Sequence, residues 1–154
     1  MSAKSTTKNI ADNRKARHEY FIEDEYEAGI VLQGTEVKSL REGRANLKDG
    51  YARVKNGELF LYQVHISPYS HTHYDNHNPL RVRKLLLHKQ EINKINGKMS
   101  ERGYSMVPLR MYFKNGKAKV MLGLVRGKKQ HDKRDTIRER DQKREFERER
   151  KQRL

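Results

Sequence analysis

Cysteine is absent from this chain of 154 residues. Disulfides, thiolate catalysis and cysteine-ligated zinc are therefore excluded, and the absence suits a reducing compartment. Long apolar runs are lacking too, since no stretch approaches the roughly 18 apolar residues that a membrane-spanning helix needs. The polar segment 1–17 has no apolar centre of the kind found in secretion signals. We therefore expect a cytoplasmic protein with no membrane partner.

The motifs of familiar enzyme active sites are also missing. The sequence has no phosphate-binding glycine loop, no nucleophile motif and no carboxylate pair on a clearly predicted element. One cluster carries metal-ligand side chains: His71, His73, Asp75 and His77. Its spacing fits no helix or hairpin template and no second cluster completes it. We expect no enzyme, no metal and no cofactor, and a metal-dependent nuclease is the least favoured alternative.

Positive charge is what the chain has in excess. Lys and Arg number 35 against 20 Asp and Glu, which gives a formal net charge of +15. Such an excess favours a polyanionic partner, most simply a nucleic acid, over a basic protein without one. The hydrophobic content of 34% supports one modest core, so a single domain is expected.

Three segments differ in composition. Residues 1–13 are rich in Ser, Thr, Lys and Asn and predict a flexible arm, with structure beginning near Arg14. Residues 14–126 hold the apolar runs of the domain. Residues 127–154 carry 12 Lys and Arg against 7 Asp and Glu, a balance of 12 − 7 = +5. Helical ion pairs contribute only about 0.2–0.5 kcal/mol each, so this tail is predicted to be disordered when free and helical on a partner.

Alternating apolar residues and turn signals predict a mainly β domain. Asn56-Gly57 and Asn115-Gly116 each supply a two-residue type I′ hairpin turn. The acidic run 23–25 predicts an exposed bend or an edge, and Gly97 predicts the end of a helix. Strands are expected at 20–22, 28–32, 50–54, 59–64, 81–87, 104–113 and 118–125, and helices at 35–42 and 90–96. Short strands with interposed helices favour a small closed antiparallel barrel of the oligonucleotide-binding (OB) kind, while a sandwich or an SH3-like barrel remains open.

The segment 27–43 combines a strand, a glycine turn and a short helix. Gly34 permits the turn, and Thr35 suits the start of the helix. Val37 and Leu40 then face inward together. The outer side of the helix is left with polar groups that can meet phosphate oxygens, namely Lys38, Ser39 and Arg41.

Three blocks of sequence resemble one bacterial family. They read Glu-Ala-Gly-Ile-Val-Leu-Gln-Gly-Thr-Glu-Val-Lys-Ser-Leu-Arg from Glu27, Asn-Pro-Leu-Arg-Val-Arg-Lys-Leu-Leu-Leu-His from Asn78, and Gly-Lys-Lys-Gln-His-Asp-Lys-Arg from Gly127. In this order they resemble the SsrA-binding proteins, also called small protein B. The resemblance implies an OB-like barrel that binds the tRNA-like domain of transfer-messenger RNA. It implies a monomeric adaptor that delivers this RNA to stalled ribosomes for trans-translation.

The resemblance also implies how the two parts would work. The tail would contact small-subunit rRNA in the decoding region and enter the mRNA channel only when that channel is empty. Elongation factor Tu and alanyl-tRNA synthetase would be partners only through the RNA. The nearest alternative is a general ribosomal or translation RNA-binding protein, which would bind unrelated structured RNAs comparably.

The predicted RNA-binding surface joins residues from several blocks. The resemblance implies roles for Tyr20, Glu27, Leu86 and His88, with barrel packing as the competing interpretation for Tyr20 and Leu86. Arg81 and Arg83 alternate along a strand and so share a face, which predicts a stripe of phosphate contacts rather than a merely solvated face. The full predicted set is Tyr20, Glu27, Gly34, Thr35, Lys38, Ser39, Arg41, Arg81, Arg83, Lys84, Leu86 and His88.

The tail carries a second predicted set. An imidazole that can stack, a carboxylate and two cations follow one another from His131 to Arg134, and the resemblance implies that they reach the ribosome. The ribosome-binding set is Gly127, Lys128, Lys129, His131, Asp132, Lys133, Arg134, Arg140, Arg144 and Arg148. Many family members carry an aromatic residue near Gln142, and Phe146 is the nearest ring here.

Overall fold

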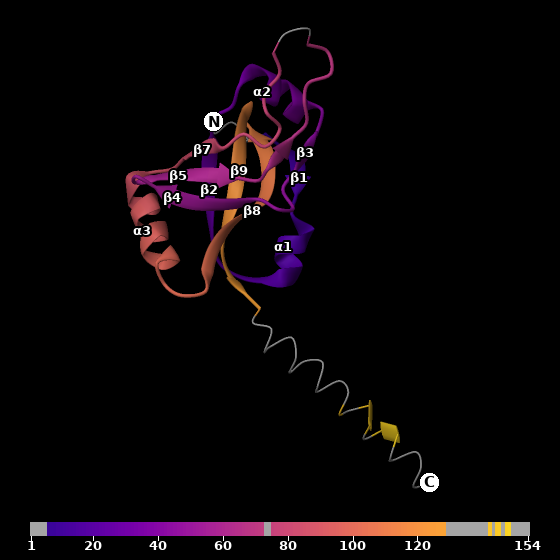
Figure 1. The fold of residues 1–154 in the computed structure, drawn as a ribbon, viewed down its shortest axis with the longest axis vertical. Helices are drawn as coiled ribbons and strands as arrows, with labels where there is room; N and C mark the ends of the chain where they lie inside the picture. The colour runs from indigo at the N-terminus through magenta and orange to yellow at the C-terminus, as the bar shows by residue number, and fades with distance from the viewer. Residues whose placement is uncertain (1–5, 73–74, 129–141, 143, 146, 149–154) are drawn as a thin grey trace.

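The computed structural model describes residues 6–72 and 75–128, with Gln142, Arg144, Glu145, Glu147 and Arg148 of the tail. These residues form nine strands and three helices in the domain (Figure 1). In chain order they are β1 Thr7–Asp12, α1 Arg14–Glu19, β2 Tyr20–Ile30, α2 Gly34–Arg41, β3 Ala45–Asn46, β4 Tyr51–Lys55, β5 Glu58–Tyr62, β6 His65–Ile66, β7 Arg83–Leu86, α3 Lys89–Met99, β8 Tyr104–Lys114 and β9 Lys117–Gly127.

The main sheet is antiparallel and closes on itself. Its strands follow the order β8-β4-β5-β7-β2-β9, and β9 pairs again with β8, while β1 adds to the edge of β8. β3 and β6 form a separate two-stranded sheet. Figure 1 shows α2 at one end of the ring, α1 near the other and α3 along its side. The prediction of a mainly β, closed antiparallel, OB-like fold with short helices is confirmed.

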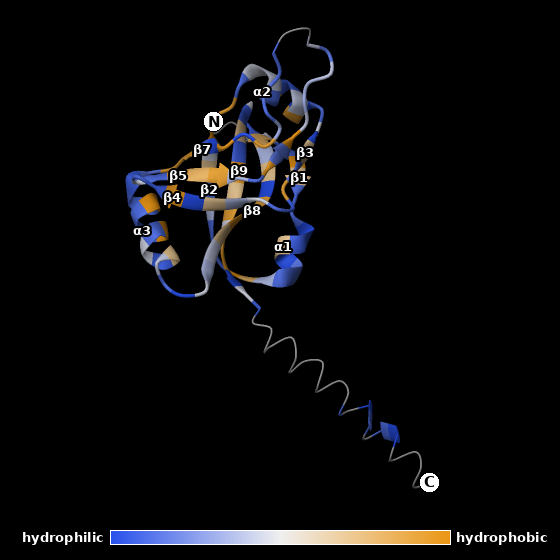
Figure 2. Cartoon of the chain, in the orientation of Figure 1, coloured by the Kyte–Doolittle hydropathy of each residue, from blue (hydrophilic) through white to orange (hydrophobic). Residues whose placement is uncertain are grey.

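The core fills the inside of this ring. Alternate residues of each strand point inward, and the strands therefore contribute small sets of completely buried side chains. Among them are Leu59, Leu61, Leu85, Val120 and Leu122. Figure 2 shows hydrophobic residues gathered on the strands and hydrophilic ones over much of the helices.

Both hairpins form as predicted. β4 and β5 join through Asn56 and Gly57, whose φ angles are 52° and 75°, and β8 and β9 join through Asn115 and Gly116, at 51° and 77°. Positive φ at both central residues is the geometry of a type I′ turn, which Asn and Gly adopt most readily.

The N-terminal segment is more ordered than its composition indicates. β1 pairs with β8, Thr7 opposite Lys114 and Asp12 opposite Arg110. Asn13 is buried, and its Nδ2 donates to the carbonyl oxygens of Leu47 and Pro108. The prediction that structure begins near Arg14 is therefore wrong, because β8 supplies backbone partners that composition does not reveal.

β2 also departs from the prediction. It runs without interruption from Tyr20 to Ile30 and pairs with β9 throughout, with an irregularity between Ile22 and Asp24. Pairing with β9 holds the acidic run 23–25 in an extended strand whose side chains are exposed. The acidic run is thus part of one continuous strand with a bulge, and because it pairs with β9 but not with β7 it lies at an edge, the second of the two predicted alternatives.

The helices begin or end elsewhere than predicted. α2 has Gln33, not Thr35, as its N-cap. The Glu36 carboxylate accepts a hydrogen bond of 2.8 Å from the backbone N–H of Gln33. α3 continues through Gly97 and ends at Met99 with Ser100 as its C-cap. Ile92 and Ile95 are buried. Their burial holds α3 against the sheet, which offsets the low helix propensity of glycine.

Candidate nucleic-acid interface

A row of outward-facing residues crosses four strands. Leu86 of β7 lies opposite Gly29 of β2, Gly29 lies opposite Lys119 of β9, and Lys119 lies opposite Tyr112 of β8. In the next row, Glu27 and Arg110 both lie opposite Met121. Their neighbours in sequence, Ala28 and Val120 among them, point into the core. The sheet therefore brings these residues together on its outer side, where Tyr112 is buried (2% exposed).

Two adjoining hollows follow this row. Their volumes are about 420 and 360 Å³, and both are lined by Gly29, Leu86 and Lys119. One extends toward Val37 of α2 and the other toward Glu27 and His88. We call the two together the outer groove; its lining includes Glu27, Gly29, Val37, Leu86, His88, Glu91, Lys117 and Lys119.

Gly29 shapes the floor of the outer groove. A Cβ atom at this position would lie 3.3 Å from Cβ of Leu86, closer than side chains normally approach. Glycine leaves room for the Leu86 side chain, which is 51% exposed. An apolar side chain exposed in a groove offers a nonpolar surface against which a base or a ribose can pack.

Glu27 is held as an anion at one end of the groove. Its carboxylate accepts a hydrogen bond of 2.5 Å from the Tyr112 hydroxyl and lies 3.3 Å from Nζ of Lys114. The Tyr112 hydrogen bond lowers the pKa of Glu27. Burial and Glu27 raise the pKa of Tyr112 to about 12. A fixed carboxylate can accept hydrogen bonds from a guanine amino group or a ribose 2′-hydroxyl.

Lysines of the β8–β9 hairpin border the groove. Lys114 pairs with Glu27, whereas Lys117 and Lys119 form no salt bridge within the part of the chain described. They can therefore meet phosphates. Sequence reasoning missed Tyr112 and these lysines, although the alternation of Lys117 and Lys119 along a strand already puts both on one face.

The structure brings three predicted residues together. Glu27, Leu86 and His88 line the same hollow, and His88 is exposed at the N-cap of α3. Tyr20 lies seven residues before Glu27 on β2, roughly 23 Å along the strand. It is half-buried and packs against a small cluster that includes Ala16. Tyr20 is therefore separate from the outer groove.

The predicted stripe of arginines is wrong for Arg83. Arg83 is completely buried and its guanidinium donates to Glu36 and to the carbonyl oxygens of Val64 and Pro79. Arg81 shares that face, as predicted, and also donates to Glu36, with its side chain 27% exposed. These two arginines hold the fold together, and Arg83 is out of reach of any phosphate.

The pKa of Glu36 reflects this network. Burial alone raises the pKa of the Glu36 carboxyl, but hydrogen bonds from Arg81, the Gln33 amide and Arg83 outweigh it and keep the pKa below its ordinary value. Lys84, between the buried positions of β7, instead pairs with exposed Glu58 at 2.9 Å. Its charge is thus partly engaged on the outer surface.

The α2 helix presents only part of its predicted set. Ser39 is buried and its hydroxyl donates to the Ser67 carbonyl at 2.6 Å, so the outward placement predicted for it is wrong. Lys38 and Arg41 are exposed, as is Gly34. Thr35 is half-buried, and its hydroxyl hydrogen-bonds Nδ1 of His77. Arg41 is available to meet phosphate, whereas the Lys38 ammonium lies over the Tyr69 ring, 5.5 Å from its centroid.

The histidine cluster is dispersed. His77 is buried, its Nε2 donates to the Ile66 carbonyl, and its Nδ1 forms a hydrogen bond with the Thr35 hydroxyl. His71 is exposed, and His73 lies outside the described residues. Across the residues the structure describes, no group of three or more metal-ligating side chains occurs. Within the same residues, no helix is long and apolar enough to cross a membrane.

The start of the tail is tied to the domain. Gly127 pairs with Tyr20 at the end of β9, and the Lys128 amide donates to the Glu19 carbonyl. Farther along, Arg144 and Arg148 are exposed and helical. The other predicted tail residues lie outside the described residues: Lys129, His131, Asp132, Lys133, Arg134 and Arg140.

Comparison with known proteins gives the family. The model of the SmpB protein family matches residues 10–152. The chain belongs to the SmpB family. SsrA-binding proteins in this family include that of Shouchella clausii, 56% identical over 154 residues (100% of this chain and 99% of the relative). Others are those of Bacillus subtilis, 57% identical over 145 residues (94% and 93%), and Geobacter sulfurreducens, 58% identical over 139 residues (90% and 91%).

A solved SmpB structure agrees with this assignment. It is described as "tmRNA-SmpB: a journey to the center of the bacterial ribosome" and matches with a TM-score of 0.70 and 47% sequence identity, covering 85% of this chain and 96% of that chain. The resemblance seen in the three sequence blocks is therefore confirmed.

Proposed function

We propose that this protein is an RNA-binding adaptor that binds the tRNA-like domain of transfer-messenger RNA and delivers it to stalled ribosomes for trans-translation. The observation that carries the proposal is identity of 56–57% to SsrA-binding proteins over nearly the whole chain. A solved relative named together with transfer-messenger RNA and the bacterial ribosome supports the same partners. Elongation factor Tu and alanyl-tRNA synthetase act on the RNA and meet this protein only through it.

The outer groove is our proposed RNA-binding site. Leu86 offers an apolar contact, and the Glu27 carboxylate selects a hydrogen-bond donor from a base or ribose. Lys117 and Lys119, with Lys38 of α2, contribute phosphate contacts that strengthen binding without selecting sequence. A carboxylate amid cations lowers general affinity for phosphate, so Glu27 contributes selectivity.

No covalent step is required of this protein. It holds and orients an RNA, while aminoacylation and peptide transfer belong to its partners, so we propose that it is not an enzyme. It would act in the cytoplasm, where translation takes place.

The tail, residues 127–154, is proposed to report the state of the ribosome. A basic segment enters an rRNA-lined channel only when no mRNA fills it, and then folds as its Arg and Lys side chains meet phosphates. The β domain, from β1 to residue 126, would hold the RNA throughout. The two tasks are then carried by separable parts of the chain.

The first experiment compares binding of the intact protein to transfer-messenger RNA and to ordinary tRNA over a range of salt concentrations. We expect tighter binding to transfer-messenger RNA, with a preference that persists as salt rises, because a shaped site depends less on counterion release than charge alone. Equal binding that collapses with salt would remove the support for an adaptor. Comparable affinity for unrelated structured RNAs would favour a general translation RNA-binding protein.

A further inference from the structure

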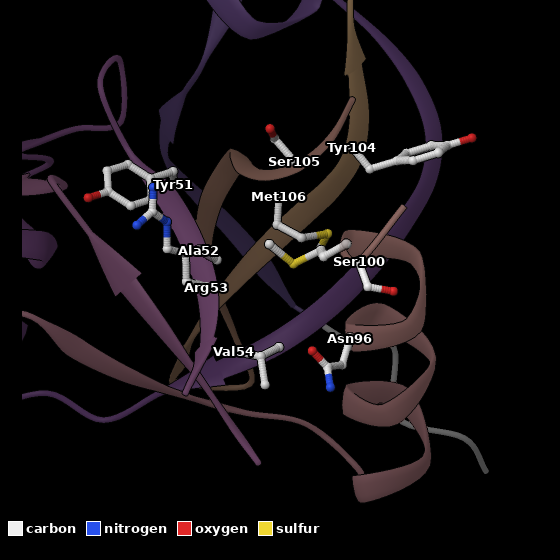
Figure 3. A pocket seen from close by; sticks show the side chains of 10 residues that line it. Tyr51, Ala52, Arg53, Val54, Asn96, Ser100, Tyr104, Ser105 and Met106 are labelled. Carbon is white, nitrogen blue, oxygen red and sulfur yellow. The ribbon is translucent and has the colours of Figure 1, made fainter. Parts of the chain in front are cut away.

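A second pocket lies where the ring of strands is most weakly joined. β4 and β8 pair at a single position, Ala52 opposite Met106. Beyond it the C-terminal half of α3 covers the gap and leaves a cavity of about 460 Å³. Figure 3 shows Tyr51 and Arg53 on one side, Asn96 and Ser100 from the α3 end on the other, and Met106 between them. We call this cavity the α3 pocket.

The lining of the α3 pocket combines an apolar floor with polar groups at the rim. Met106 is completely buried beneath the pocket, and Met99, which is partly exposed, supplies soft, polarizable surface that suits a flat ring. Arg53 stacks its guanidinium on Tyr51, 5.0 Å from the ring centroid, and Tyr51 stacks on Tyr62. The opposite face of a guanidinium held in this way can stack on a base.

Asn96 is the hydrogen-bonding group of the pocket. It is exposed, and its side-chain amide makes no hydrogen bond to any other residue that the structure describes. An asparagine amide can donate and accept at once, and it matches the edge of adenine with two hydrogen bonds. No Asp or Glu lines the pocket, so it suits a neutral ring carried on an anionic backbone better than a metal ion or an amine.

The α3 helix connects this pocket to the outer groove. His88, in the groove, is the N-cap of α3, and Asn96 lies eight residues later, roughly 12 Å along the helix axis. Gln90, Lys94 and Lys98 repeat at four-residue spacing, so they share the outer side of α3, away from the sheet. Lys98 lies beside the pocket, with its ammonium 5.9 Å from the Tyr104 ring centroid and 3.9 Å from a Glu101 carboxylate oxygen. One folded RNA that follows α3 can therefore touch both sites, with Lys98 beside the pocket.

We propose that the α3 pocket receives an unpaired base, adenine by preference, of the same transfer-messenger RNA that occupies the outer groove. The proposal rests on the function proposed above. The base stacks on Arg53 and Met99, Asn96 pairs with its edge, and Lys98 lies near the phosphates. A second contact at the far end of α3 fixes the orientation of the RNA, which one groove alone leaves free to pivot.

The test uses the full-length protein and a transfer-messenger RNA transcript, with two variant pairs. Asn96→Ala is compared with Asn93→Ala, an exposed asparagine on the same helix outside the pocket. Arg53→Gln is compared with Lys55→Gln, which removes the same charge from the same strand. Thermal unfolding checks that all four variants fold. The readouts are equilibrium affinity and dimethyl sulfate probing of the RNA.

We expect Asn96→Ala to weaken binding about tenfold, the effect of losing one bidentate contact, and Asn93→Ala to leave it unchanged. An unpaired adenine protected by the wild-type protein should become reactive with Asn96→Ala and Arg53→Gln, but stay protected with Asn93→Ala and Lys55→Gln. Equal affinity and equal protection in each pair of variants would overturn the proposal that the α3 pocket binds a base, and would leave the adaptor function unaffected. A wild-type protein without preference for transfer-messenger RNA would overturn both proposals.

Discussion

Glu36 of α2 and Arg83 of β7 form an ion pair in which both side chains are completely buried. The carboxylate also binds Arg81, and the Arg83 guanidinium binds two backbone carbonyl oxygens, so both charges have partners. α2 is thereby fixed to the strand that ends at Leu86 in the outer groove. An arginine predicted to touch RNA instead positions the elements that form the groove.

Removing the Glu36 carboxylate should destabilise the fold severely. Glu36→Ala leaves Arg83 buried and without its anionic partner, which typically costs about 3–5 kcal/mol. Glu58→Ala, which removes the exposed pair with Lys84, should cost at most about 1 kcal/mol. Urea unfolding of both variants measures the free energies. Similar losses of unfolding free energy in the two variants would mean that the buried Glu36 pair contributes no more to stability than the exposed Glu58 pair.

Stability should depend on the same carboxylate at acid pH. The pKa of Glu36 is lowered in the folded protein, so its contribution is fully present above the unfolded value near 4.5 and is lost as pH falls through the folded pKa. The urea concentration at the midpoint of unfolding should therefore decrease as the pH is lowered from neutral to about 3. Replacing Glu36 with Gln should flatten that fall, with Glu58→Gln as the reference. An unchanged slope in Glu36→Gln would assign the acid sensitivity to other groups.

Glu27 should act on RNA binding through specific hydrogen bonds and not merely through its negative charge. Glu27→Ala should weaken binding to transfer-messenger RNA about tenfold, because hydrogen bonds to a charged group contribute about 1.5–3 kcal/mol. Glu25→Ala removes an equal charge from an exposed position of the same strand and should strengthen binding slightly. Titration of both variants against labelled RNA measures the effect. Stronger binding in both would mean that Glu27 acts only as a negative charge.

Two glycines should respond oppositely to alanine. Gly97 lies inside α3 with nothing within 4 Å of an added Cβ, so Gly97→Ala should stabilise the protein by about 0.5–1 kcal/mol. A Cβ at Gly50 would lie 2.7 Å from a Val64 methyl carbon and 2.8 Å from Pro108, so Gly50→Ala should destabilise it by about 1–3 kcal/mol. Urea unfolding measures both. No gain from Gly97→Ala would indicate that α3 frays before that residue.

The tail should be separable from RNA binding. Replacing Asp132, Lys133 and Arg134 with alanine should leave affinity for transfer-messenger RNA intact and abolish tagging of peptides on stalled ribosomes. A chain truncated before Gly127, which lacks the tail, should behave in the same way. Binding assays and a reconstituted tagging reaction measure the two properties separately. Weakened RNA binding in the triple variant would contradict the division into two working parts.

Local signals were enough for much of the fold. Asn56-Gly57 and Asn115-Gly116 predicted both hairpins, because the type I′ turn depends on two adjacent residues that tolerate positive φ. The alternation around Val82 correctly put Arg81 and Arg83 on one face. Composition predicted a polyanionic partner, and three blocks of sequence predicted the SmpB family.

Long-range pairing decided what local patterns left open. β1 exists because β8 offers it an edge, and β2 crosses its acidic run because β9 pairs with it throughout. Which face of β7 is buried depends on Glu36, far away in sequence, so the stripe of phosphate-binding arginines could not be tested from spacing alone. The outer groove likewise requires Leu86, Gly29 and Lys119 to meet across three strands.

The sequence by itself determined the family, the positive charge, the two hairpins and the mainly β class, since each depends on residue types or on neighbours along the chain. Tertiary structure alone decided which basic side chains are buried and which remain available to bind phosphate. Arg83 and Lys119 carry the same formal charge, but Arg83 is enclosed beside a carboxylate and Lys119 lines an open groove. Accessibility arises from strand pairing between distant segments, which no local pattern contains.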